Sequence, residues 1–238
     1  MRKVRADLHL HTCLSPCADT QMQATAIVEQ ARKVGLDMIA ICDHNSAENV
    51  AAVVKAGLRE ALPVIPGIEI TSSEEVHILG LFKTEQDLMG VQEIVYENLS
   101  GENCEDAFGP QTIVDEWDNA VGTNHKLLIG ATNLTLEKVV EIIHQFSGLA
   151  IASHVDRERF GLIGQLGFIP KGLKLDAIEV SKPSAAAKEY DYHVICSSDA
   201  HFLDDIGKNS SCFMLEETSI HEIGKALRQE LGRRIVSN

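Results

Sequence analysis

Two histidines near the start of the chain, His9 and His11, are separated by a single residue at the end of an apolar segment. Side chains alternate between the two faces of a β-strand, so residues two apart point to the same face. Two imidazoles side by side on one strand are the arrangement that two ligands of one metal ion need. Asp199 and His201 repeat this spacing towards the other end of the chain. The two pairs therefore indicate a metal site.

Further metal-type side chains stand in or beside other apolar segments. His44 follows "DMIAICD", Glu69 lies in "PGIEI", His77 lies in "EVHILGLF" and His154 closes "LAIASH". A single histidine beside a strand is usually a polar residue that finds a local partner, but so many strands leading to such residues favour one shared site. Imidazole and carboxylate together suit Zn, Mn or Fe, and a bridging carboxylate suits a cluster of two or three ions.

Apolar, β-branched runs alternate with helical patterns along all 238 residues. The predicted strands cover 3–10, 37–45, 63–71, 75–82, 149–154, 175–183, 192–201 and 210–216. The predicted helices cover 22–35, 46–61, 85–99, 110–122, 134–148, 184–190 and 219–231, and 98–112 and 155–174 read as long loops near a site. This alternation predicts an α/β fold, either a parallel sheet or a (β/α) barrel. Without a linker or repeat, residues 1–238 are expected to form a single domain.

Composition excludes several classes of protein. The net charge of −14 and the aromatic content of 5% argue against a protein that grips long duplex nucleic acid, while small anions remain possible partners. No segment approaches the roughly 20 apolar residues of a membrane span, so we expect no membrane partner and a cytoplasmic location. The spacing of Cys13 and Cys17 lacks the third cysteine of an iron–sulfur cluster, so both are expected to be free thiols beside the metals and not metal ligands.

Six short motifs, in the order "DLHLHT", "CDHN", "PGIE", "VHILG", "ASH" and "SSDAH", resemble those of the PHP (polymerase and histidinol phosphatase) superfamily. The resemblance extends from residue 5 to about residue 215. It implies a distorted (β/α)7 barrel, TIM-like, with the active site at the C-terminal rim of the strands. It also implies a phosphoesterase that uses a metal-activated hydroxide at a centre of two or three divalent ions.

The resemblance also implies how the ligands divide among the ions. His9 and His11 would share one metal with Glu69 and Asp199, and Glu69 would bridge to a second. The remaining ligands of that second metal would be His77 and His154.

A third metal would be held by His44, His201 and one residue from the loop after His11. In many relatives this residue is an Asp or His about five positions beyond the His-x-His pair. Pro16 occupies that position here, and the first carboxylate is Asp19. We therefore favour Asp19 as the ligand.

Three other residues are candidates for catalysis. Arg157 follows His154, and Lys182 follows the strand "AIEVS", so either could neutralise a phosphoryl oxygen at the rim. Asp43, next to His44, could orient a ligand or shuttle a proton, and orientation is the favoured role.

The substrate stays open at this level. The leading hypothesis is a stand-alone enzyme that acts on a small phosphorylated molecule. Alternatives are an exonuclease or a phosphatase of nucleotides or short oligonucleotides, and a histidinol-phosphatase-like enzyme. A non-catalytic metal-binding regulatory domain and a metal-dependent C–N hydrolase are less favoured, and the sequence does not indicate the oligomeric state.

Overall fold

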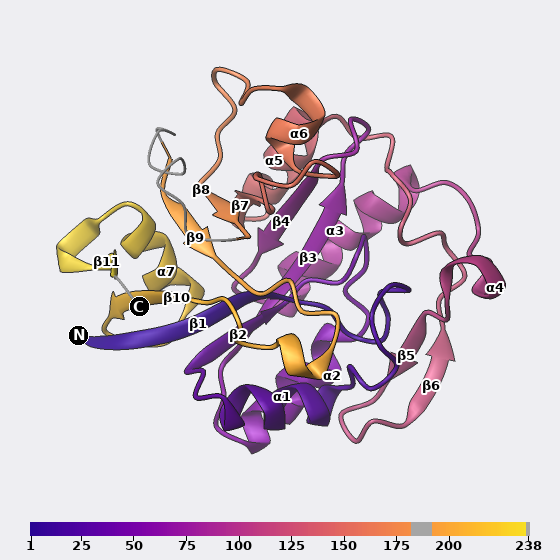
Figure 1. Ribbon diagram of the computed structural model, residues 1–238, viewed down its shortest axis with the longest axis horizontal. Helices are drawn as coiled ribbons and strands as arrows, with labels where there is room; N and C mark the ends of the chain where they lie inside the picture. The colour runs from indigo at the N-terminus through magenta and orange to yellow at the C-terminus, as the bar shows by residue number, and fades with distance from the viewer. Residues whose placement is uncertain (182–191, 237–238) are drawn as a thin grey trace.

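The computed structural model describes residues 1–181 and 192–236 and is built around one curved sheet (Figure 1). The sheet has the order β11-β10-β1-β2-β3-β4-β7-β8-β9. Its barrel strands are β1 (Arg2–Leu10), β2 (Met38–Ile41), β3 (Val64–Thr71), β4 (His77–Leu81), β7 (Leu149–Ala152), β8 (Ala177–Val180) and β9 (Val194–Cys196). A parallel bridge pairs Leu10 with Ala200, just beyond β9, so the sheet is nearly closed. The expected distorted, TIM-like barrel is confirmed.

One strand of the barrel runs against its neighbours. β4 pairs antiparallel with both β3 and β7, whereas β1–β2, β2–β3, β7–β8 and β8–β9 are parallel. His77 is the first residue of β4 and pairs with Thr71 at the end of β3. Reversal of β4 therefore brings the start of this strand to the rim where the other barrel strands end.

Strand β1 pairs irregularly with β2 near its C-terminal end, beside the first of the two histidines. The pairing of β1 with β2 shifts register between Asp7 and Leu10, which encloses His9. Such irregularities re-aim side chains and are common beside active sites. The same strand also pairs antiparallel with β10 (Ser211–Leu215), which in turn pairs with β11 (Arg234–Val236).

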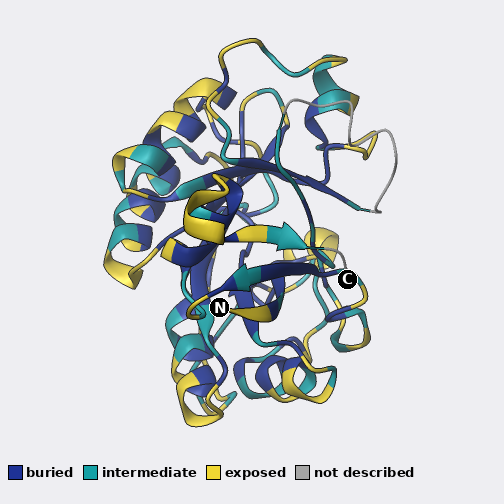
Figure 2. Ribbon diagram, turned by 90° about the vertical axis from the view of Figure 1, so that its left-hand side faces the viewer, coloured by how far each residue is buried: buried dark blue, intermediate teal, exposed yellow. Residues whose placement is uncertain are grey.

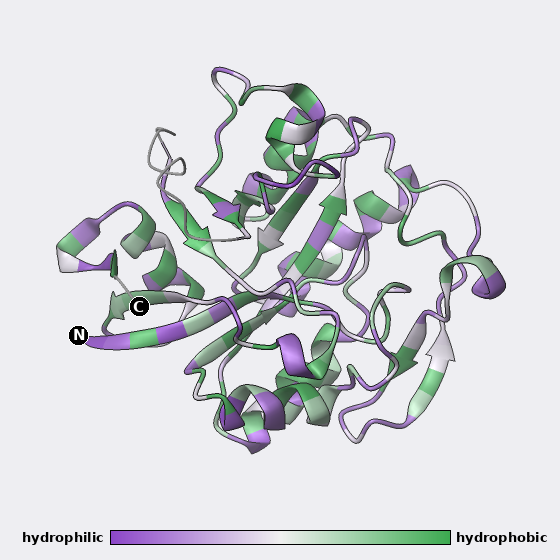
Figure 3. Ribbon diagram, viewed as in Figure 1, coloured by the Kyte–Doolittle hydropathy of each residue, from purple (hydrophilic) through white to green (hydrophobic). Residues whose placement is uncertain are grey.

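Helices cover the outside of the barrel, with buried residues towards the strands and exposed residues towards solvent (Figure 2). The longer ones are α1 (Ala24–Lys33), α2 (Val50–Arg59), α3 (Glu85–Asn98), α5 (Leu136–Gln145) and α7 (Ile220–Leu227). Hydrophobic residues lie both on the barrel strands and on the helices that cover them (Figure 3). Alternate residues of β2 belong to two different hydrophobic core clusters. Ile39 and Ile41 pack with the helices α1 and α2, whereas Met38 and Ala40 pack with α7 and β10.

The structure corrects the predicted helix over 110–122. This segment is a hairpin of β5 (Thr112–Val114) and β6 (Ala120–Thr123), which stands apart from the main sheet (Figure 1). The Asp115 carboxylate accepts the N–H groups of Trp117 and Asn119 at 2.8 and 2.9 Å. An Asp that bonds the backbone two and four residues on stabilises a turn and competes with helix formation.

Other predicted boundaries move by a few residues. The second helix begins at Val50 rather than Ser46, because the Ser46 hydroxyl pairs with the Tyr96 hydroxyl at 2.7 Å instead of capping the helix. The two expected loops contain the short helices α4 (Glu105–Phe108) and α6 (Leu162–Leu166). Two single turns of 3₁₀ helix, Leu203–Asp205 and Glu230–Gly232, complete the elements of residues 1–181 and 192–236. The predicted helix at 184–190 lies outside the described residues.

In the part of the chain that the structure describes, no helix combines the length and apolar character needed to cross a bilayer.

A buried ion pair fixes the last helix to the end of the chain. Arg233 donates to Glu222 at 2.9 Å, and Glu222 also accepts from Lys225 and from the backbone N–H of Glu216. Hydrogen bonding from Arg233 outweighs burial and lowers the pKa of Glu222 to about 2. This carboxylate therefore joins α7 to β10 and β11.

Replacing Glu222 with Gln should lower the free energy of unfolding at neutral pH by about 1–3 kcal/mol, because Arg233 loses its charged partner. A lowered folded-state pKa gives stability above the unfolded value near 4.5, and this stability is lost as the pH falls through about 2. Urea unfolding should therefore show that the difference in unfolding free energy between wild type and Glu222→Gln shrinks below pH 4.5. The exposed Glu217→Gln is the control. A deficit that is constant down to acid pH would contradict this role.

Candidate metal centre

Strand β3 presents the Glu69 carboxylate to a ring of imidazoles at the barrel rim. Glu69 is fully buried, and its two oxygens face side chains from β1, the end of β2, β4 and the end of β7. The distances from Oε1 are 3.0 Å to His77 Nδ1, 3.3 Å to His154 Nε2 and 3.4 Å to His9 Nε2, and those from Oε2 are 3.0 Å to His44 Nδ1 and 3.5 Å to His11 Nε2. One carboxylate therefore holds the centre of the cluster.

The electrostatics of this ring follow from burial and crowding. Burial raises the pKa of Glu69, but the charges of His77 and His9 outweigh it and hold that pKa well below its usual range. Burial lowers the pKa of His77 to about 4, and burial with the neighbouring His201 and His44 lowers the pKa of His11. The cluster therefore presents an ionised carboxylate, and the lone pairs of His77 and His11 are available. In contrast, the charges of Asp199 and Glu69 outweigh burial and raise the pKa of His9.

Several of these buried atoms have no hydrogen-bond partner within the described residues. They are both oxygens of Glu69 and the Nδ1 atoms of His44, His77 and His154. Buried polar atoms without partners are costly, and imidazole nitrogen with carboxylate oxygen is a donor set for Zn, Mn or Fe. The residues present therefore fit a metal centre. Three groups have ligand atoms within 4.8 Å of one another: His9, His11 and Asp199; His44, Glu69 and His77; and His11, His44 and His201.

Glu179, on β8, is a functional candidate that the sequence reasoning missed. Its Oε1 lies 3.1 Å from His9 Nδ1 and accepts the backbone N–H of His154 at 3.2 Å. A carboxylate behind a ligating histidine fixes the ring orientation and makes the ring a stronger ligand. The available signal was an acidic residue inside the apolar run "AIEV".

Asp43 lies behind the cluster and holds the loop that follows β1. Its carboxylate accepts from the backbone and hydroxyl of Thr12 and from the Ser15 hydroxyl, each at 2.7 Å. The Ser15 hydroxyl in turn lies 2.9 Å from His11 Nδ1. The contacts of Asp43 therefore fit the orienting role expected from its place beside His44.

Two of the candidate ligands have unusual backbone geometry. His154 has φ 28° and Asp199 has φ 51°, both in the left-handed region. Such conformations cost on the order of 1–3 kcal/mol each and persist mainly at functional sites. They aim the His154 ring at Glu69 and the Asp199 carboxylate at His11, 3.0 Å away.

Arg157 reaches the same cluster from the loop after β7. Its Nη1 donates to Asp199 Oδ2 at 2.5 Å, its Nε donates to the Ser181 hydroxyl at 3.0 Å, and 43% of its side chain is exposed. The guanidinium therefore stands between the candidate ligands and solvent. Lys182, the other predicted cation, lies outside the described residues.

The loop after His11 differs most from expectation. The Asp19 carboxylate accepts the backbone N–H of Gln21 at 2.8 Å, and the three groups among the described residues include neither Asp19 nor Cys17. Cys17 instead lies within hydrogen-bonding reach of His44 and His201. Desolvation raises the pKa of the Cys17 thiol, but these two imidazoles outweigh it and lower that pKa to about 6.

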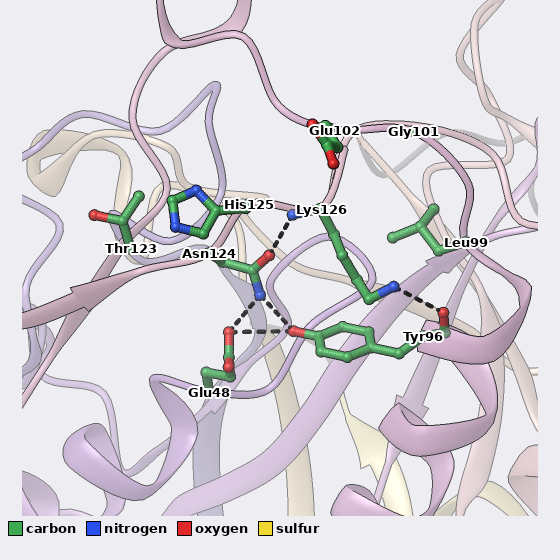
Figure 4. Close-up of a pocket in the computed structure, with 9 residues that line it drawn as sticks. All are labelled: Glu48, Tyr96, Leu99, Gly101, Glu102, Thr123, Asn124, His125 and Lys126. Carbon is green, nitrogen blue, oxygen red and sulfur yellow. Dashed lines mark hydrogen bonds between the residues drawn. The ribbon is translucent and has the colours of Figure 1, made fainter.

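A cavity of about 550 Å³ lies beside the segment that follows His44, between α3 and β6 (Figure 4). Its polar groups satisfy one another: Asn124 donates to Glu48 and to the Tyr96 hydroxyl, and the Lys126 ammonium donates to the Tyr96 carbonyl at 3.0 Å. Asn45 adds bonds to the carbonyls of residues 128 and 130 at 2.8 Å. These hydrogen bonds connect the segment of residues 99–132 to the residues that follow His44.

Replacing Glu179 with Gln should weaken metal binding about 10- to 100-fold, because His9 loses the carboxylate that orients it. Calorimetric titration with Zn²⁺ or Mn²⁺ measures this affinity, and Glu158→Gln, an exposed change near the same rim, is the matched control. Equal affinity in both variants would show that Glu179 does not support the metal ligands.

Comparison with known proteins places the chain in a family. The sequence model of the PHP domain matches residues 7–198. A phosphoribosyl 1,2-cyclic phosphate 1,2-diphosphodiesterase of Eggerthella lenta is 34% identical over 80 residues, and a 5'-3' exoribonuclease of Haemophilus influenzae is 31% identical over 78 residues. Each alignment covers 32% of this chain, but only 29% and 27% of those proteins, so the chain aligns with less than a third of either relative.

Solved structures share the fold. The lesion-specific endonuclease Q of Pyrococcus furiosus has a TM-score of 0.77 at 20% identity, over 98% of this chain and 58% of that one. A putative metal-dependent phosphoesterase of Bifidobacterium adolescentis has a TM-score of 0.59 at 18% identity, over 86% of this chain and 91% of that one.

One of these structures corrects an expectation. Endonuclease Q in complex with a 27-mer duplex that carries an abasic lesion has a TM-score of 0.73 at 20% identity, over 98% of this chain and 58% of that one. The exclusion of long duplex nucleic acid was therefore wrong, because net charge averages over a surface whereas contacts with DNA are local. Because the family model matches most of its length, the chain belongs to the PHP-domain family.

Proposed function

We propose that this protein is a metal-dependent phosphodiesterase whose substrates are nucleic acids or nucleotide-like diesters. The observation that carries the proposal is the buried Glu69 carboxylate, which faces five imidazoles and has no hydrogen-bond partner among the described residues. Metal-dependent hydrolysis of phosphate esters is the chemistry that such a donor set supports.

The proposed ligands fall around Glu69. They are His9, His11, His44, Glu69, His77, His154, Asp199 and His201. His44 and His11 each belong to two of the three groups of the described residues, so neighbouring sites would meet at these two histidines. When bound, two or three ions of the Zn, Mn or Fe class lower the pKa of a water molecule and neutralise phosphoryl charge.

Arg157 is the side chain proposed to bind the substrate phosphate. Guanidinium groups donate in a planar fork that matches phosphate oxygens. Asp199 and Ser181 hold the guanidinium at the cluster, and its partial exposure leaves donors free to face a substrate from solvent. In this position Arg157 would orient a phosphoryl group and offset its negative charge.

The choice of diesters rests on two supports. The curated relatives are named as a diphosphodiesterase and an exoribonuclease, and a protein of the same fold binds a damaged DNA duplex. In this chain, Phe202 directly follows His201 and is 53% exposed, and Phe108 is 43% exposed beside Gly109, which abuts Pro16. Exposed rings beside a phosphate site can stack on bases without regard to sequence.

Replacing Arg157 with Ala should lower kcat/KM about 100-fold, because one charged donor to the phosphate is lost. Arg157→Lys should recover part of this loss, since it keeps the charge but not the fork. Arg159→Ala, an exposed change in the same loop, is the control, and metal content is measured in parallel. If the Ala variant kept full activity with its metals, the phosphate-binding role would be rejected.

The substrate class is tested by a panel with Mn²⁺, Zn²⁺ or Fe²⁺. It includes single-stranded DNA and RNA, intact and abasic duplexes, a cyclic phosphodiester and phosphomonoesters. We expect cleavage of diesters, and loss of that cleavage in His9→Ala and Asp199→Ala. Turnover of monoesters alone would refute the diester assignment, and no turnover by metal-replete protein would refute the proposed function.

A further inference from the structure

The loop after β1 brings one side chain to the imidazole cluster that the expected ligand set did not use. Cys17 lies within hydrogen-bonding reach of both His44 and His201. Those two histidines, with His11, form one of the groups whose ligand atoms lie within 4.8 Å of one another. A sulfur atom is therefore placed beside a ready set of nitrogen ligands.

The histidines indicate a ligand position independently of the cysteine. His44 is 5% exposed, and His11 is fully buried. The centroid of the His11 ring lies 4.6 Å from that of His44 and 4.2 Å from that of His201. Buried imidazoles crowded this closely are stabilised by a shared cation.

Backbone contacts hold Cys17 in this place from both sides. Before it, the carbonyl of Ser15 accepts the N–H of Ala18 at 2.9 Å, and the hydroxyl of Ser15 is bound to Asp43. After it, the N–H of Asp19 donates to the carbonyl of His201 at 2.8 Å. The loop is thus bound to the segment after β9 that carries His201, with the Asp19 carboxylate turned to its own backbone.

We propose that Cys17 is a thiolate ligand of a metal ion that is also bound by His44 and His201. The inference rests on the proposed function, since it adds a ligand to the same centre. On binding, the thiol proton leaves to solvent as the sulfur–metal bond forms. A thiolate beside imidazoles selects the softer Zn, Fe or Co ions over Mn or Mg at this position.

Substitution with Co²⁺ tests the ligand directly. Wild-type protein loaded with Co²⁺ should show the near-ultraviolet charge-transfer absorption of a sulfur–cobalt bond. Cys17→Ser should lose this absorption and bind one Co²⁺ fewer per chain, whereas Cys104→Ser, a change of another exposed cysteine, should keep both. In Zn²⁺-loaded wild type, X-ray absorption should show a Zn–S distance of about 2.3 Å.

A third variant separates loss of a ligand from loss of structure. Cys17→Asp should restore the metal count without the sulfur absorption, and should shift the preference of this position towards Mn²⁺. Wild-type protein that binds metals and cleaves diesters without a sulfur–metal band would overturn this inference alone, as would a band that persists in Cys17→Ser. Wild-type protein that binds no ions when these metals are supplied in excess would overturn both the inference and the proposed function.

Discussion

The interaction on which the site depends is the burial of one carboxylate among five imidazoles. Glu69 lies on β3, with neighbours from several other parts of the barrel, so its position requires the sheet to curve and nearly close. Burial of a charge is costly unless it is paired. The imidazoles supply part of the pairing, and the atoms left without partners define where cations would complete it. The stability of this region and its chemistry thus have a common origin.

Around this centre, a second layer of buried polar residues holds the ligands in place. Glu179 contacts both the His9 ring and the backbone at His154, and Asp43 fixes the loop beside His11 and His44. Each of these carboxylates lies at or just beyond the end of a short apolar strand. The barrel therefore supplies rigid positions, and the loops supply the groups that face substrate, such as Arg157.

Much of this arrangement could be predicted from the sequence, because spacing of two on a strand and apolar runs ending in His or Asp report directly on geometry. The nearly closed barrel was expected from the motif resemblance. His77 was expected among these residues, but only the antiparallel direction of β4 explains how the start of a strand reaches the rim.

Glu179 was missed because one acidic residue in an apolar strand has no periodic signal. The role of Cys17 depends on how a loop folds back towards His201, which local patterns do not encode. Similarly, the side-chain bonds of Asp115 overrode the helical pattern over 110–122.

The bridge between Leu10 and Ala200 marks the seam where the two ends of the barrel meet. His9 and His11 lie on one side of this seam, and Asp199 and His201 lie on the other. A cation shared across it would join β1 to the segment that follows β9. Ligands so far apart in the chain cannot come together until translation has passed residue 201, and a nascent chain would hold only an open, partial centre. The metal centre could thus be complete only after the barrel has closed. Hydrolytic activity would therefore appear only in the folded barrel.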